Sequence, residues 1–89
     1  MSITAKISEW VCGASPLANG KTLGLARNAM IDIVGCMVAG ATDEATRRAL
    51  AAVIDLGAGP AHVVGGGARL PAPQAALVNG TAAHALDFD

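Results

Sequence analysis

The sequence predicts a mainly α-helical fold with one short β-hairpin near residues 61–70. Three observations support this prediction. Apolar residues recur at steps of three and four along most of the chain, which is the spacing of one helix face. Glycines and prolines interrupt that pattern at intervals, and the run Gly65-Gly66-Gly67 is the only hairpin signal.

A first helix is expected to run from a cap at Ser2 or Thr4 to about Cys12, before Gly13 interrupts it. Its apolar residues form one stripe, made of Ile3, Ile7, Trp10 and Val11.

A long second helix is expected over about Thr22–Ala39, and its apolar residues extend nearly all round it. Such a helix is typically buried. Its glycines, together with Gly40, each cost about 1 kcal/mol against alanine in a helix interior, which is tolerable where another backbone approaches closely. For Asp32 we expect a buried or edge hydrogen bond to Asn28 or to a neighbouring helix.

A third helix is expected over about Glu44–Leu56, capped by Thr42 or Asp43 and closed by Gly57. Its expected buried face consists of Ala49, Leu50, Val53 and Ile54.

The expected hairpin pairs Ala61–Val64 with Ala68–Leu70. The glycine run between them lacks the GK[ST] ending and the GxGxxG spacing of phosphate loops, so it indicates a tight turn. His62 is expected to be an ordinary polar side chain of the hairpin.

A last helix is expected over about Ala72–Ala85, with prolines in its first turn. The pair Asn79-Gly80 in its middle predicts either a weak point or close packing.

Composition excludes several classes of protein. Hydrophobic residues make up 53% of the chain and charged residues only 15%, whereas disordered chains are polar and highly charged. The net charge of −1 leaves no basic stripe for nucleic acid. Only two cysteines, Cys12 and Cys36, are present and no CxxC pair, which agrees with a cytoplasmic protein, although a disulfide between the two stays open.

The N-terminus lacks the continuous apolar core of a signal peptide. The uncharged stretch Ile33–Ala41 is far shorter than the ~20 residues that span a bilayer, so no membrane contact is expected. A chain this small and this apolar leaves apolar surface in water. Because it also stops directly after its densest polar cluster, we expect residues 1–89 to be the N-terminal part of a larger helical domain, marginally stable alone.

Chemistry is concentrated in one segment, NGTAAHALDFD from Asn79, which brings together His84, Asp87 and Asp89. An imidazole and two carboxylates suit acid–base chemistry, and an apolar frame around a carboxylate disfavours its charged form. HxxDxD is not a metal-ligand spacing, so no metal is expected. The alternative is a helix end followed by a solvated acidic turn.

The segment RLPAPQAALVNGTAAHALDFD, Arg69–Asp89, resembles the signature of the MmgE/PrpD family. The segments ARNAMIDIVGCMVAGA, Ala26–Ala41, and GPAHVVGGGARLPAP, Gly59–Pro73, are similar to the family's long second helix and its hairpin. The resemblance implies the start of a large helical domain in a cytoplasmic, dimeric enzyme that needs neither metal nor organic cofactor. The family includes 2-methylcitrate dehydratase, cis-aconitate decarboxylase and iminodisuccinate epimerase.

The resemblance therefore implies a lyase acting on a small di- or tricarboxylate. The alternatives are an isomerase or epimerase of the same family, and a non-catalytic helical interaction module. Asp87 matches the first acidic residue of the family's DFD-type motif, in the active-site pocket; Asp89 matches a position where dehydratases can carry Asn, and His84 one that is not always His. The family's further Thr, His and Lys groups would follow Asp89, so these 89 residues alone are expected to be inactive.

Overall fold

A computed structural model describes residues 2–14 and 19–87 and confirms the mainly α-helical prediction. The described residues form, in order, α1 (Ile3–Gly13), α2 (Gly20–Gly40), α3 (Glu44–Val53), a 3-10 turn η1 (Ile54–Leu56), β1 (Ala61–His62), β2 (Arg69–Leu70) and α4 (Ala72–Ala85). The last helix has the predicted bounds, and the other three begin or end within three residues of theirs.

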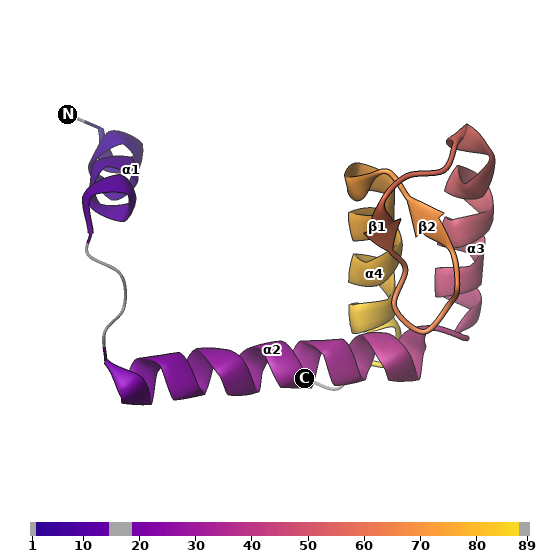
Figure 1. Cartoon of the computed structure of the whole chain (residues 1–89), viewed down its shortest axis with the longest axis horizontal. Helices are drawn as coiled ribbons and strands as arrows, with labels where there is room; N and C mark the ends of the chain where they lie inside the picture. The colour runs from indigo at the N-terminus through magenta and orange to yellow at the C-terminus, as the bar shows by residue number, and fades with distance from the viewer. Residues whose placement is uncertain (1, 15–18, 88–89) are drawn as a thin grey trace.

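The elements are arranged in an open U (Figure 1). Helix α2 is its base, while α3, α4 and the hairpin stand together at the C-terminal end of α2 and α1 lies beyond the other end. The radius of gyration is 16.4 Å, and a compact domain of this length would have about 12 Å. The chain therefore does not close into a globule around one centre.

The core lies between α3, the hairpin and α4. It consists of Val53, Val63, Leu70, Ala75 and Val78, with Ala49, Leu50, Ala61 and Ala68 packed partly against it. Val78 of α4 is fully buried, so α4 lies at the centre of this core.

Helix α4 also meets the end of α2, and the contact depends on a glycine. A Cβ built on Gly40 would collide with the backbone of Ala82, including its carbonyl carbon at 2.9 Å. The Gly40 carbonyl accepts a hydrogen bond of 2.7 Å from Oγ1 of Thr46, a side chain that is only 3% exposed. Gly40 thus joins α2, α3 and α4, and here the expected close approach is confirmed.

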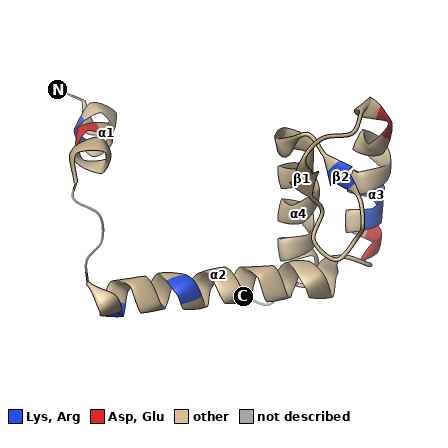
Figure 2. Cartoon of the chain, in the orientation of Figure 1, with Lys and Arg blue, Asp and Glu red and all other residues tan. Residues whose placement is uncertain are grey.

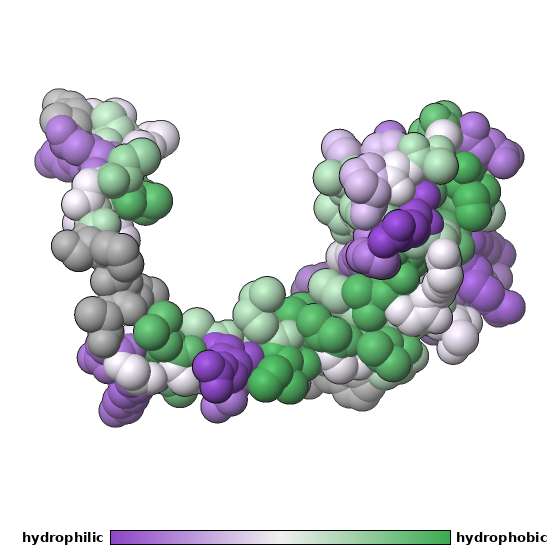
Figure 3. Space-filling view, viewed as in Figure 1, coloured by the Kyte–Doolittle hydropathy of each residue, from purple (hydrophilic) through white to green (hydrophobic). Residues whose placement is uncertain are grey.

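Most of α2 and all of α1 are exposed, which corrects the prediction that the long helix is buried. Gly40 is the only buried residue of α2, and α1 has none. Nothing lies within 4 Å of a Cβ built on Gly24 or Gly35. Space-filling colours show apolar surface along α2 and on α1 (Figure 3). The spacing shows which apolar residues share a helix face, but most of these residues are exposed in the described part of the chain.

Side chains cap three helix starts. Ser2 Oγ accepts from the Ala5 N–H at 3.1 Å, and Asn19 Oδ1 accepts from the Lys21 N–H at 2.9 Å, which explains why α2 starts before Thr22. Asp43, and not Thr42, caps α3 by accepting from the Ala45 N–H at 3.0 Å.

The end of α3 differs from the prediction. The α-helix stops at Val53 and tightens into η1, and Gly57 then turns the chain at a φ of 129°. This tightening rotates Ile54 out of the expected buried face, leaving it 44% exposed.

The hairpin is shorter than predicted. Its antiparallel register pairs Ala61 with Leu70 and His62 with Arg69. The glycine run forms the turn as expected, and Gly65 supplies the positive φ of 77°. A Cβ there would meet the Ala41 side chain at 2.8 Å, so the turn also lies against the end of α2.

By length and composition, α2 is able to cross a membrane, and 6% of its most apolar stretch is buried. Arg27 and Asp32 lie near the middle of this helix, where each would cost about 2.5–3.5 kcal/mol in a bilayer. This cost argues against a spanning role.

Charged residues are sparse over the view in Figure 2, and Lys and Arg are not gathered into one patch there.

Candidate functional site

Helix α4 positions His84, and Asp87 follows directly after its last turn. Pro71 precedes its first residue and Pro73 lies in its first turn, where a missing N–H costs nothing. One face of the helix is anchored by Ala75, Val78, Ala82 and Ala83, all buried. The C-terminal end of α4 is therefore held by packing on both sides of Val78.

Asn79 ties α4 to the hairpin. Its Oδ1 accepts from the Val64 N–H at 2.9 Å, and its Nδ2 donates to the His62 carbonyl at 3.0 Å. Of the two expectations for Asn79-Gly80, the close contact is confirmed at Asn79, while a Cβ on Gly80 would meet nothing within 4 Å.

His84 and Asp87 lie at the exposed end of this helix. The Asp87 N–H donates to the His84 carbonyl at 3.2 Å, which closes the last turn. Both side chains are exposed, and no side-chain hydrogen bond joins them within the described residues. Asp89, the third predicted site residue, and Phe88 of the expected apolar frame lie outside the described residues. Leu86, the other part of that frame, is 45% exposed.

Asp87 has a left-handed backbone conformation. Its φ is 49°, and it is the only non-glycine residue with a positive φ in the described part of the chain. Aspartate adopts this region more readily than most residues, and helices often end with one residue in it. Non-glycine residues held in this conformation cluster at active sites and ligand clamps.

No group of three His, Cys, Asp or Glu side chains gathers into a metal site among residues 2–14 and 19–87. Cys12 and Cys36 are both free, so the disulfide that the sequence left open does not form in this structure.

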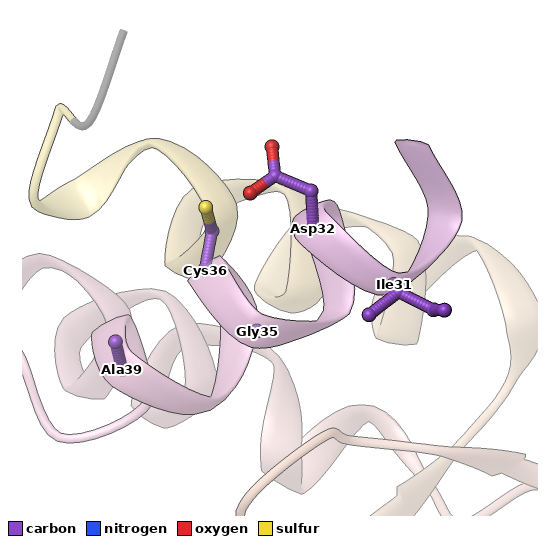
Figure 4. A pocket seen from close by; sticks show the side chains of 5 residues that line it. All are labelled: Ile31, Asp32, Gly35, Cys36 and Ala39. Carbon is purple, nitrogen blue, oxygen red and sulfur yellow. The ribbon is translucent and has the colours of Figure 1, made fainter. Parts of the chain in front are cut away.

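A separate open hollow of about 500 Å³ lies along α2 (Figure 4). It is lined by Ile31, Asp32, Gly35, Cys36 and Ala39. Asp32 is exposed and makes no hydrogen bond with the described residues, which corrects the expected bond to Asn28 or a neighbouring helix. The predicted site and the hollow are therefore different places, one at the end of α4 and one on α2.

His62 behaves as predicted, as a polar side chain of the hairpin. Its Nε2 lies 3.0 Å from Nη2 of Arg69, its cross-strand neighbour, and both are exposed. The sequence did not identify the hydrogen-bond partners of Asn79, and it gave no role to Thr46. Neither has a local pattern that identifies it, because each bonds to a group on another element.

Comparison with known proteins gave one match. A sequence model described as the MmgE/PrpD N-terminal domain matches residues 5–89, which include all of the described elements from α2 onward and the predicted site. No curated protein and no solved structure matched the chain.

Proposed function

The chain belongs to the MmgE/PrpD family, and we propose that it is the N-terminal part of a lyase that acts on a small di- or tricarboxylate. The proposed reaction is acid–base chemistry at a carbon next to a carboxylate, without metal or organic cofactor. The proposed setting is a cytoplasmic homodimer built by the full-length chain.

The observation that carries this proposal is the position of Asp87. It lies inside the matched range, just after the end of a helix that is anchored by buried residues. A rigid element that presents one acidic side chain in a constrained backbone conformation is suited to holding a functional group in place. His84 lies one turn earlier on the same exposed end.

The substrate class determines what Asp87 does. Dehydration begins with removal of a proton next to a carboxylate, and this step needs a positioned base and groups that hold the developing negative charge. A lone carboxylate repels a polyanionic substrate. We therefore propose that Asp87 is a positioning residue, which orients a basic His or Lys from another part of the enzyme. The alternative is that Asp87 takes the substrate proton itself.

The test is substitution of Asp87 by Asn and by Ala in the full-length gene product that carries these residues. Turnover of 2-methylcitrate, cis-aconitate and iminodisuccinate is measured, together with deuterium uptake at the substrate carbon in D₂O. We expect loss of at least about 10²-fold in kcat with each variant, because acid–base groups contribute that much or more.

Asp55→Asn is the matched control. Asp55 is an exposed carboxylate on η1, away from the end of α4, so its replacement leaves turnover unchanged. Asp87 variants that keep full turnover would refute the assigned role. An enzyme that turns over none of the three substrates and exchanges no deuterium would refute the proposed activity.

The same measurement decides between lyase and isomerase. An isomerase exchanges the substrate proton and yields the other stereoisomer without releasing water or carbon dioxide.

A non-catalytic interaction module is favoured by one observation, the exposed apolar residues of α1 and α2, among them Ile3 at 77% and Trp10 at 70% exposure. That module would show neither turnover nor exchange.

A further inference from the structure

The chain contains the dipeptide Asn-Gly twice. It occurs at Asn19-Gly20, where α2 begins, and at Asn79-Gly80, in the middle of α4. This dipeptide deamidates spontaneously more readily than others, because glycine has no Cβ to hinder the approach of its own nitrogen to the asparagine side chain. Since the covalent chemistry of the two pairs is the same, a difference in their reactivity has to come from the fold.

The reaction needs no enzyme and consumes water. The glycine nitrogen attacks Cγ of the asparagine, so an N–Cγ bond forms, the Cγ–Nδ2 bond breaks, and ammonia leaves with the proton of the attacking N–H. Water then opens the cyclic imide at either carbonyl, which gives aspartate or isoaspartate. Ring closure brings the glycine nitrogen over the asparagine Cβ, an arrangement that neither an extended nor a helical ψ provides. Each pair therefore has to leave its folded conformation before it reacts.

Little holds Asn19 in its folded conformation. It precedes the first residue of α2 with an extended ψ of 114°, and both residues of the pair are exposed. Its side chain makes the hydrogen bonds of a cap, since Oδ1 accepts from the Lys21 N–H at 2.9 Å and from the Thr22 N–H at 3.4 Å. The attacking N–H, that of Gly20, has no acceptor in the described part of the chain, as is usual at the start of a helix. Opening the site breaks one cap, which slows the reaction about fivefold relative to an unstructured peptide.

Asn79 is held by its own helix and by the hairpin. Its Oδ1 accepts from the Val64 N–H at 2.9 Å, and its Nδ2 donates to the His62 carbonyl at 3.0 Å. Gly80 lies inside α4, where each N–H donates to the carbonyl four residues earlier. The neighbouring Val78 is fully buried, so opening this site unwinds α4 within the core. Such an opening is as rare as unfolding of the whole unit, and it slows the reaction at least about 100-fold.

The two products also differ in their effect on the structure. Among the described residues the Asn19 side chain uses only Oδ1, an acceptor that aspartate keeps, and a negative charge is favourable at a helix N-terminus. Asn79 uses Nδ2 as a donor to the His62 carbonyl, and a carboxylate in its place has no proton to donate. Aspartate is therefore tolerated at position 19, whereas at position 79 it breaks the contact between α4 and the hairpin.

We propose that Asn19-Gly20 is a site of spontaneous deamidation in the folded protein, and that the contact of α4 with the hairpin preserves the chemically identical pair Asn79-Gly80. The inference does not depend on the proposed catalytic activity, because it concerns only the reactivity of two side-chain amides.

The first test is ageing of the full-length gene product at neutral pH, followed by peptide mapping with mass spectrometry. Replacement of the side-chain NH₂ by OH raises the mass of the affected peptide, and an isoaspartyl methyltransferase with labelled S-adenosylmethionine counts the isoaspartate. We expect Asn79 to react at least about 20-fold more slowly than Asn19, the ratio of the two protections. In urea that unfolds the protein, both pairs react at similar rates. Equal rates in the folded protein, or a folded protein in which neither pair reacts while the unfolded protein reacts at both, would overturn the proposal.

The second test uses matched glycine variants. Gly20→Ala adds a Cβ that hinders the attack and meets nothing within 4 Å, so it suppresses deamidation at Asn19 while α2 keeps its fold. Gly80→Ala adds the same group where nothing lies within 4 Å, and it leaves the total deamidation unchanged because Asn79 is already protected. If Gly20→Ala deamidates as much as the parent, or if Gly80→Ala is the variant that lowers the total, the reaction does not take place at Asn19 and the proposal fails.

The variants Asn19→Asp and Asn79→Asp copy the two products. We expect the midpoint of urea unfolding to be unchanged in Asn19→Asp, because the cap keeps its acceptor. In Asn79→Asp we expect faster hydrogen exchange at the Val64 amide, because the side chain no longer bonds to both groups of the hairpin. The opposite order would show that Asn79 is held no better than Asn19, which would also overturn the proposal.

Discussion

Replacement of Gly40 by Ala tests how α2 is attached to the rest of the chain. The new methyl group would collide with the backbone of Ala82, and a backbone atom cannot turn aside as a side chain can. Overpacking of this kind costs about 1–3 kcal/mol. The better helix propensity of Ala returns about 1 kcal/mol of that cost. If α2 moves away from α4, the hydrogen bond from Thr46 to the Gly40 carbonyl is also lost, which destabilises the chain by a further ~1 kcal/mol.

We therefore expect Gly40→Ala to destabilise the chain by about 1–3 kcal/mol. For a domain of this size, that lowers Tm by roughly 4–24 °C. Gly80→Ala is the matched control, since it adds the same methyl group inside α4 where nothing lies within 4 Å. The control stabilises by about 1 kcal/mol, because only the propensity changes.

Thermal and urea unfolding, followed by far-ultraviolet circular dichroism, measure both variants. Opposite signs for the two glycines support the packing argument. If Gly40→Ala is as stable as the control or more stable, the contact between α2 and α4 is not close, and the reasoning fails.

Two further changes probe one contact between elements and one helix cap. Asn79→Ala removes both hydrogen bonds to the hairpin and costs about 1–3 kcal/mol, and faster hydrogen exchange at the Val64 amide checks the loss; unchanged protection would contradict it. Asp43→Ala removes the cap of α3 and costs about 1 kcal/mol in urea unfolding, while Thr42→Ala changes stability by less than about 0.5 kcal/mol; the reverse order would make Thr42 the cap.

Local signals predicted the local structure well. The bounds Ala72–Ala85 of α4 follow from prolines at its start and from helical spacing, and the turn at Gly65 follows from the need for a positive φ. These features depend on a few neighbouring residues, so they are visible in the sequence.

Burial was predicted less well, because it depends on what a face meets. The spacing of apolar residues in α2 shows that they share faces, but it does not show which face another element covers. The expectation for Ile54 failed for a related reason, since the change from α-helix to 3-10 turn after Val53 rotates the side chains that follow.

The candidate site was predicted in part. Position at a helix end put His84 and Asp87 close together, and the structure adds the left-handed conformation of Asp87, which no residue pattern announced. Asn79 was singled out for its place beside Gly80, but its partners on the hairpin come from the fold and not from its neighbours in sequence.

The corner at Gly40 has a mechanical consequence. Helix α2 has 21 residues, so it is a rod about 30 Å long that is clamped at one end. A rotation of about 5° about Gly40 would move the N-terminal end of α2 by about 3 Å. A displacement of that size is enough to break a hydrogen bond made at that end. The packing of Gly40 against Ala82 and its hydrogen bond with Thr46 therefore determine the position of the N-terminal end of α2.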